Sequence, residues 1–238
     1  MSAYVKFMES AGARVVPIIY DEPEDSIIEK VSKLDGVLYP GGGGDYINAG
    51  KIVLDYIKKS NDEGKFYPAW GTCLGFERLA TFTATDPDSV LENYGVSHVS
   101  IPIELRVDPM DSKLFCQLKD DAHIFESTNY TYNSHHYSID PKKLETDAGL
   151  KDFWTLTSVS KDADGREFVA SMESKDYPIM ATQFHPEKTT QIFADNYGIN
   201  HSWESIRMNR FFADLFVQMS RANENSFGDF KETQPYLI

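Results

Sequence analysis

The first 84 residues alternate between short apolar runs and longer segments with the spacing of amphipathic helices. Apolar runs that predict buried strands cover residues 13–20, 36–40 and 66–70. Helical spacing covers residues 4–11, 25–34, 49–64 and 73–84. Repeated strand–helix units with short connections are typical of a parallel sheet that helices cover on both faces. We therefore predict an α/β fold with a doubly wound, mostly parallel sheet.

After about Ala84 the pattern changes to strands that follow one another. Strand-like runs cover residues 96–107, 153–160, 167–173 and 177–184. A turn signal at Asp162–Gly165 lies between two of them and predicts a hairpin. An amphipathic segment at 203–225 predicts a closing helix. Because no linker interrupts the pattern, we predict one domain over residues 1–238, with a loosely ordered tail after about residue 225.

The composition excludes two classes of partner. The chain has 37 Asp and Glu residues against 23 Lys and Arg residues, which gives a formal net charge of −14. Such a charge repels phosphate backbones, so we expect no nucleic-acid partner. No apolar run approaches the roughly 18 residues that could cross a bilayer, so we expect no membrane partner. The first ten residues lack the basic start and apolar core of a signal peptide.

Cys73 is one of two cysteines and lies between Gly71 and Gly75, at a predicted passage from strand to helix. Small residues on either side of a nucleophile let the backbone make a sharp turn that presents the side chain at the edge of the sheet. The following helix start favours a thiolate and offers the N–H of Leu74 to an oxyanion. The alternative is a buried structural cysteine with incidental glycines. Cys116 has no such context and is interpreted as an apolar filler.

The stretch YPGGGGDY places four glycines at the end of a predicted strand, one strand–helix unit before Cys73. Glycines in such a loop can expose backbone N–H groups to a ligand, so the loop is a candidate for a second oxyanion donor. The alternative is a flexible loop without a ligand.

His185 and Glu187 lie two residues apart at the end of a predicted strand, in the stretch QFHPEK. Residues at this spacing in a strand point to the same face, so the carboxylate can orient the imidazole. A thiol nucleophile requires such a base, and we predict a Cys73–His185–Glu187 triad that performs thioacyl transfer. The alternative is a surface histidine that lies near a glutamate by chance.

These features together resemble the class I glutamine amidotransferase-like superfamily, and most closely the gamma-glutamyl hydrolases. Four segments carry the resemblance in order: YVKFMESAGARVVPI, GVLYPGGGGDY, FYPAWGTCLGFERLA and YPIMATQFHPEK. The resemblance implies a flavodoxin-like fold and cysteine-dependent hydrolysis of γ-glutamyl peptide bonds in folate poly-γ-glutamates, without a metal or cofactor. The small-molecule substrate is thus a folyl-poly-γ-glutamate, and a homodimer is compatible with the resemblance.

By position, the resemblance implies a role for each motif residue. Cys73 is the nucleophile, His185 the general base and then acid, and Glu187 the orienting carboxylate. Gly42 and Leu74 supply the oxyanion N–H groups. His135, in the stretch YNSHHYS, matches a histidine near the active site. Further candidates for substrate binding, chosen because they lie near the motifs, are Glu77, Arg78, Arg166 and Lys188.

The sequence leaves two other functions open. A glutaminase that passes ammonia to a synthetase usually carries Gln at the position of Glu77, which speaks against that activity here. An inactive, N-terminally truncated homologue that only binds ligands is the other alternative. Family members begin with a leader and a strand before the helix that here starts at Met1, so we expect that strand to be missing or replaced. The resemblance also implies a lysosomal, vacuolar or extracellular location.

Overall fold

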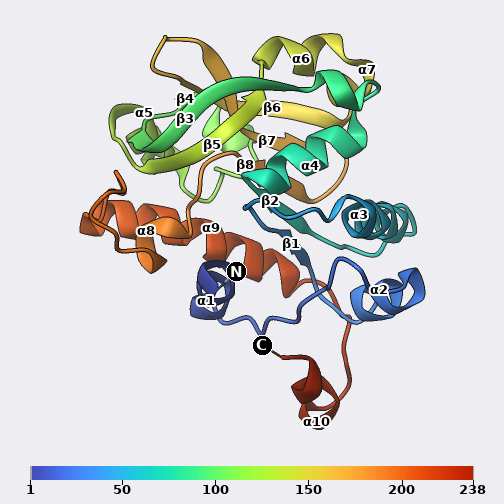
Figure 1. Ribbon diagram of the computed structural model, residues 1–238. Coiled ribbons are helices and arrows are strands. Elements are labelled where there is room, and N and C mark those ends of the chain that lie inside the picture. The colour runs from blue at the N-terminus through green and yellow to red at the C-terminus, as the bar shows by residue number, and fades with distance from the viewer. Residues whose placement is uncertain (1, 238) are drawn as a thin grey trace.

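A six-stranded sheet forms the centre of the molecule in the computed structural model, which describes residues 2–237 (Figure 1). Met1 and Ile238, which the predicted domain includes, lie outside the described residues. In spatial order the strands are β1 (Val37–Tyr39), β2 (Ala69–Thr72), β8 (Ile179–Thr182), β7 (Glu167–Ser174), β6 (Trp154–Lys161) and β4 (Glu104–Leu105).

The sheet is mixed, so the prediction of a mostly parallel sheet was only partly right. The neighbours β1, β2 and β8 run parallel, whereas β7 and β6 pair antiparallel with their neighbours, and so does β4. The reason is local. The predicted turn at 162–165 joins β6 directly to β7 as a hairpin, and a second short connection leads from β7 to β8. Such short connections reverse the chain direction, whereas parallel neighbours need a crossover.

Helices cover the sheet on both faces, as the sequence predicted. They are α1 (Ser2–Ser10), α2 (Glu24–Val31), α3 (Ile47–Asp62), α4 (Leu74–Thr83) and α9 (Trp203–Ser220). Alternate residues of β2 show the two layers: Ala69 belongs to the core cluster with α2, α3 and α4, and Trp70 to the cluster with α1 and α9. Trp70 packs against Phe212 of α9 with ring centroids 5.8 Å apart.

The predicted strand at residues 13–20 was wrong. This segment leads from α1 to α2 without forming any strand, although it is apolar. A strand needs a hydrogen-bonding neighbour. Within residues 2–237 no segment pairs with the free edge of β1, which is the last strand on that side of the sheet.

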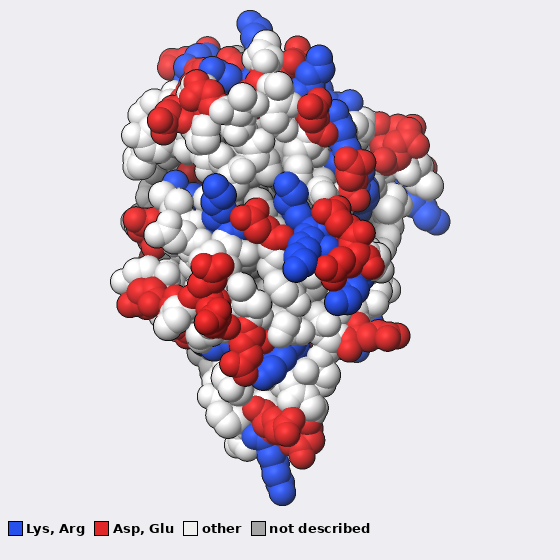
Figure 2. Space-filling view, turned by 90° about the vertical axis from the view of Figure 1, so that its right-hand side faces the viewer, with Lys and Arg blue, Asp and Glu red and all other residues white. Residues whose placement is uncertain are grey.

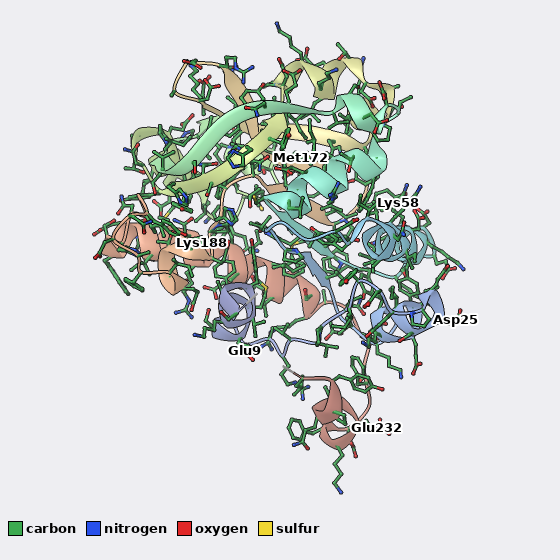
Figure 3. The ribbon with its side chains drawn as sticks, viewed as in Figure 1. Glu9, Asp25, Lys58, Met172, Lys188 and Glu232 are labelled. Carbon is green, nitrogen blue, oxygen red and sulfur yellow. The ribbon has the colours of Figure 1, made fainter. Side chains whose placement is uncertain are left out.

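The second half of the chain adds a separate two-stranded sheet of β3 (Leu91–Ile101) and β5 (Thr131–Ile139). The predicted strand 96–107 is therefore divided between two sheets, and Pro102 lies in the break between β3 and β4. The short helices are α5 (Ile124–Ser127), α6 (Pro141–Thr146), α7 (Ala148–Phe153), α8 (Lys188–Gln191) and α10 (Phe230–Thr233). The tail carries α10 at one tip of the molecule, where Glu232 is labelled (Figure 3).

Charged side chains of both signs are interspersed over the face shown in Figure 2. Acidic groups outnumber basic ones in the sequence, but this face carries no large patch of one sign. Among the described residues, no helix has the length and apolar character needed to span a bilayer.

Candidate active site

Cys73 occupies the single-residue turn between β2 and α4, at the carboxyl edge of the parallel strands. Its backbone has φ 53° and ψ −110°, in a region that side-chain-bearing residues rarely adopt. The Cys73 N–H donates to the carbonyl of Thr182 in β8 at 2.9 Å, which fixes the turn to the neighbouring strand. Strain of this kind persists only where the surrounding structure imposes it, and it is typical of functional sites.

The flanking glycines are required by sterics. A Cβ atom at Gly75 would lie 2.0 Å from the carbonyl oxygen of Tyr39 in β1. A Cβ atom at Gly71 would lie 2.7 Å from the side chain of Leu79 and 2.9 Å from the backbone of Gly75. The helix start thus packs directly against two strands, and the Gly-x-Cys-x-Gly pattern is explained by this close approach.

His185 follows β8 and is held from both sides. Its backbone N–H donates to the carbonyl of Tyr132 in β5 at 2.8 Å. Its Nδ1 atom lies 2.8 Å from Oε1 of Glu187, which is fully buried at the start of α8. With Nδ1 engaged by the carboxylate, Nε2 is the imidazole nitrogen that remains for chemistry.

The charges around His185 favour its protonated form. Burial alone would lower the pKa of His185, but the negative charges of Glu187 and then Cys73 outweigh it and raise the pKa to about 10. The imidazole therefore keeps its proton at neutral pH and can balance a thiolate at Cys73. No protein atom within the described part of the chain satisfies Oε2 of Glu187.

Tyr4, in the first turn of α1, is a member of the site that sequence reasoning missed. Its hydroxyl lies 3.3 Å from Nδ1 of His185 and accepts a hydrogen bond from the N–H of Gly41 at 2.9 Å. Burial, followed by the charges of Glu187 and Cys73, raises the pKa of Tyr4 far above its ordinary value, so the hydroxyl stays neutral. In the sequence Tyr4 was indistinguishable from the other apolar positions of an amphipathic helix.

The glycine loop closes over the thiol. A Cβ atom placed at Gly41 would lie 3.0 Å from both Cys73 Cβ and His185 Cε1. The two side chains therefore approach the same point beneath the loop. Gly42 follows with φ 127°, and a Cβ atom there would meet nothing within 4 Å. Its predicted role as an oxyanion donor, and that of Leu74 at the first position of α4, stay predictions.

Glu77 lies beneath the site rather than on its surface. Its side chain is buried in α4 and accepts a hydrogen bond from Gln183 Nε2 at 3.2 Å, two residues before His185. Burial raises the pKa of Glu77 to about 7, although the bond from Gln183 and the charges of Arg78 and His185 act in the opposite direction. Because Glu77 is buried and bonded to Gln183, we interpret it as a residue that supports the site and not as one that contacts the substrate.

His135 and His136 are distinguished by the alternation of β5. His135 is buried, with Nδ1 2.9 Å from the carbonyl of Tyr137 and Nε2 3.2 Å from Oδ1 of Asn133, whereas His136 is exposed. Burial, together with the charge of His185, lowers the pKa of His135 to about 4. His135 is therefore neutral at physiological pH, and its ring packs against Phe168 with centroids 5.1 Å apart.

The three basic candidates differ in their surroundings. Arg78 of α4 is half-buried, and its Nε atom is buried without a hydrogen-bond partner among the described residues. Lys188 begins α8 directly after Glu187 (Figure 3). Arg166 lies in the β6–β7 turn, where it pairs with Asp162 at 3.1 Å and its guanidinium stacks 4.2 Å from the Tyr94 ring centroid.

Residues 2–237 contain no group of three or more His, Cys, Asp or Glu side chains arranged to hold a metal ion. Both cysteines are free thiols.

Comparison with known proteins identifies relatives along the whole chain. The family model described as glutamine amidotransferase class-I matches residues 2–203. Gamma-glutamyl hydrolase B of Dictyostelium discoideum is 32% identical over 236 residues, covering 96% of this chain and 68% of its own length. Gamma-glutamyl hydrolase of Rattus norvegicus is 34% identical over 243 residues, covering 100% of this chain and 76% of its own length.

A solved structure supports the fold alone. A protein of Thermoplasma acidophilum, described as a candidate component of GMP synthase, superposes with a TM-score of 0.52 at 18% identity, covering 98% of this chain and 90% of its own length. Together with the match over residues 2–203, the relatives in Dictyostelium discoideum and Rattus norvegicus show that the chain belongs to the glutamine amidotransferase class-I family, among homologues named gamma-glutamyl hydrolase.

Proposed function

We propose that the chain hydrolyses γ-glutamyl peptide bonds through a thioacyl intermediate on Cys73, with folate poly-γ-glutamates as substrates. One observation carries the proposal: Cys73 stands on a strained turn where the Glu187-bound imidazole of His185 and the glycine loop approach the same point. The relatives named gamma-glutamyl hydrolase support the substrate class.

Acylation begins with the thiolate of Cys73, whose charge is balanced by the protonated imidazole of His185. The sulfur attacks the γ-carbonyl carbon of the substrate, and the carbonyl oxygen becomes an oxyanion. The N–H groups of Leu74 and Gly42 are the proposed donors to this oxygen. When the intermediate collapses, the C–N bond breaks and His185 gives its proton to the leaving amine. The products of this half are a thioester that links Cys73 to the shortened pteroylglutamate chain, and a released amine, which is glutamate or a γ-glutamyl peptide.

Deacylation uses the same groups, but His185 now accepts a proton where it donated one during acylation. His185, now neutral, accepts a proton from water as the water oxygen attacks the thioester carbonyl. The C–S bond then breaks and restores the Cys73 thiolate and the protonated imidazole, and the product leaves as the γ-carboxylic acid, which loses its remaining proton to the solvent. Glu187 stabilises the imidazolium and fixes the ring so that Nε2 faces the reacting atoms.

The substrate is anionic, whereas the chain has a net charge of −14, so the substrate carboxylates need local cations. Arg78 is our candidate for the α-carboxylate next to the scissile bond, because it is half-buried in α4, the helix that begins directly after Cys73.

The test is incubation of the purified chain with pteroylpenta-γ-glutamate, with the products separated by length. We expect shortened pteroylglutamates and released glutamate or γ-glutamyl peptides, and none of these with Cys73→Ala. Parallel incubation with glutamine detects the rival glutaminase activity. Ammonia release from glutamine without cleavage of the γ-glutamyl peptide, or no turnover of either substrate, would overturn the proposal.

For the location we propose the lysosome, the vacuole or the exterior, on the basis of the family alone. Fractionation of the native protein from its source cells tests this, and confinement to the cytosol would contradict it.

A further inference from the structure

The segment that joins α8 to α9, residues 192–202, is bonded to the outer edge of β3. Gly198 donates its N–H to the carbonyl of His98 at 3.0 Å, and its carbonyl accepts the hydroxyl of Ser100 at 2.6 Å. Gly198 and Val99 also form a parallel bridge. Because β5 occupies the other edge of β3, the segment adds a third backbone to the two-stranded sheet. In Figure 1, α8 and α9 lie below the left-hand ends of these two strands.

The contact between Gly198 and β3 has no room for a side chain. A Cβ atom at Gly198 would lie 2.7 Å from the carbonyl oxygen of His98 and 3.4 Å from Cα of Val99, and both are backbone atoms. His98 itself has φ 55°, which residues with a side chain rarely adopt, and it lies where the register of β3 against β5 shifts, between Val96 and Val99. Strain of this kind persists only where the surrounding structure imposes it. The segment and the irregular part of β3 therefore fix each other.

Three aromatic side chains connect this contact to β5, and we call them the aromatic cluster: Tyr197, His98 and Tyr132. Tyr197 is stacked on His98, with ring centroids 4.3 Å apart and an angle of 19° between the planes. Tyr197 also lies 6.2 Å from the Tyr132 ring centroid, at an angle of 30°. Nδ1 of His98 lies 2.9 Å from the hydroxyl of Tyr132. Each member thus contacts the other two.

Tyr132 connects the aromatic cluster to the candidate active site. Its carbonyl accepts the backbone N–H of His185 at 2.8 Å, and its ring centroid lies 6.2 Å from that of the imidazole. Glu187 engages Nδ1 of the same imidazole and so sets the orientation of the ring. His185 lies beyond the end of β8, so the bond to Tyr132 holds its backbone where the strand no longer does. The position of Tyr132 therefore contributes directly to the position of His185.

Tyr132 is buried, Tyr197 is half-buried and His98 is exposed. The cluster thus extends from the imidazole to the surface, where the α8–α9 segment covers it. Catalytic groups must be held within about 0.5 Å of their productive geometry, whereas a fold tolerates larger local shifts. Loosening of the cluster should therefore lower the reaction rate before it unfolds the chain.

We propose that Tyr197 is a positioning residue for His185: its ring holds Tyr132, and Tyr132 holds the imidazole in place to pair with the thiolate of Cys73. This role rests on the catalytic roles that we propose for Cys73 and His185. Tyr197 contacts its two partners through its ring, so an aromatic ring without the hydroxyl should suffice at this position.

The first test is the steady-state hydrolysis of a γ-glutamyl peptide. Tyr197→Leu should lower kcat by about tenfold or more, because small displacements of a reacting group cost much of the rate, and should leave KM within about threefold of the wild type. Tyr197→Phe keeps the stacked ring and should restore kcat to within about twofold of the wild type. Circular dichroism and thermal unfolding verify that each variant is folded.

Phe193→Leu is the matched control. Phe193 belongs to the same segment and is stacked on a histidine at the same centroid distance, 4.3 Å, but its partner is His201 rather than a member of the aromatic cluster. Phe193 is 75% exposed. We expect this variant to keep kcat within about twofold of the wild type.

The second test needs no substrate. Alkylation of Cys73 by iodoacetamide near pH 6 depends on the thiolate that the imidazolium of His185 stabilises, whereas near pH 9 a thiolate forms without this help. Tyr197→Leu should therefore slow alkylation at least about threefold near pH 6 and less than about twofold near pH 9. The comparison of the two pH values separates a change in ion pairing from a change in access to the sulfur.

Gly198→Ala tests the same connection from the backbone. The new Cβ atom must displace the segment from β3, so this variant should reproduce the kinetic and alkylation changes of Tyr197→Leu. The two variants disturb different atoms of one contact, and agreement between them supports positioning by the segment.

Several outcomes would overturn the proposal. They are a wild-type kcat in Tyr197→Leu, equal losses in Tyr197→Leu and Tyr197→Phe, or an equal loss in Phe193→Leu. A raised KM with an unchanged kcat would instead assign Tyr197 to substrate binding, which also overturns it. If the wild type cleaves no γ-glutamyl peptide but Tyr197→Leu still slows alkylation near pH 6, the proposed function is wrong and the positioning role of Tyr197 is supported.

Discussion

The hydroxyl oxygen of Tyr4 lies 3.3 Å from Nδ1 of His185, although 181 residues separate them in the chain. The same hydroxyl accepts the N–H of Gly41, in the loop that closes over Cys73. Tyr4 therefore joins the first helix to the imidazole and to the glycine loop. The placement of the His185 imidazole and of the glycine loop therefore depends on the position of α1.

Tyr4→Phe should lower kcat by about tenfold to a hundredfold, because the partly buried N–H of Gly41 loses its acceptor, at a cost of up to about 3 kcal/mol, and the loop is then free to shift. Steady-state hydrolysis of a γ-glutamyl peptide measures this effect. Tyr46→Phe is the matched control, since the Tyr46 hydroxyl donates to Pro40 at 2.8 Å in the same loop. We expect the control to change kcat by less than about threefold. A wild-type kcat in Tyr4→Phe would show that the hydroxyl contributes nothing to turnover.

Glu187→Gln should change the pH profile as well as the rate. The negative charge of Glu187 helps to raise the pKa of His185 to about 10, so its removal lets the imidazole lose its proton at lower pH. The alkaline limb of kcat/KM should then move toward neutrality, with activity at about pH 9 falling more than at about pH 6. We expect an overall loss of at least about a hundredfold.

The control for this variant is a second histidine–glutamate pair on the surface. His123 Nδ1 lies 2.6 Å from Oε2 of Glu126, and His123 is exposed. Glu126→Gln should leave the pH profile of turnover unchanged. If Glu187→Gln has the same profile as Glu126→Gln, the carboxylate does not govern the protonation of His185.

Cys73→Ala should abolish turnover and leave the fold intact. Alanine keeps the Cβ atom that this turn already accommodates at φ 53°, so no new strain arises. Hydrolysis assays, circular dichroism and labelling with iodoacetamide near pH 6 measure the outcome, with labelling of Cys73 expected in the wild type. Cys116→Ala should retain activity, because Cys116 is half-buried in a turn and its Sγ contacts the carbonyl of Lys113 at 3.9 Å. Turnover by Cys73→Ala would exclude covalent catalysis at this sulfur.

The candidate site was largely predictable because its residues lie in local patterns. Gly71 and Gly75 mark a close approach of backbones, which the structure contains. His185 and Glu187 do contact each other, but they lie in the turn between β8 and α8 and not on one face of a strand, as the sequence predicted. The resemblance to gamma-glutamyl hydrolases, drawn from these motifs, is confirmed by the relatives along the chain. Tyr4 was not predictable in this way, because its partner is remote in sequence and its own helix shows only apolar spacing.

The local sequence pattern did not predict correctly which segments pair as strands in the sheet. The apolar run at 13–20 has the composition of a buried strand, but strand formation depends on a neighbour that hydrogen-bonds to it. Within residues 2–237 that neighbour is missing, and the run lines a groove instead. Likewise the hairpin at 162–165 was predicted, but its consequence, an antiparallel half of the sheet, required knowledge of which strands lie side by side.

Glu77→Gln should change stability in a pH-dependent manner. Burial raises the pKa of Glu77 to about 7 in the folded chain, above its ordinary value of 4.5. The folded state therefore holds a proton that the unfolded state has lost between these two values, so the wild type loses stability as pH rises from about 4.5 to about 7. Glutamine keeps an oxygen to accept from Gln183 and does not titrate.

Thermal unfolding of the two proteins at several pH values measures this difference. We expect similar stability near pH 4.5 and a variant that is more stable by up to about 3 kcal/mol at pH 8. All other groups titrate in both proteins, so the difference isolates Glu77. A constant difference across this range would mean that Glu77 is not protonated in the folded chain.

Gly75→Ala should destabilise the fold and displace the nucleophile together. The new Cβ atom would lie 2.0 Å from the carbonyl oxygen of Tyr39, so α4 and β1 must separate. We expect a loss of at least about 2 kcal/mol in urea unfolding, together with lower activity in the fraction that remains folded. The matched control is Gly43→Ala, because a Cβ atom at Gly43 meets nothing within 4 Å and the position has no positive φ. This control should stay within about 0.5 kcal/mol of the wild type. If the two alanine variants are equally stable, close packing of α4 against β1 does not explain the second glycine of the motif.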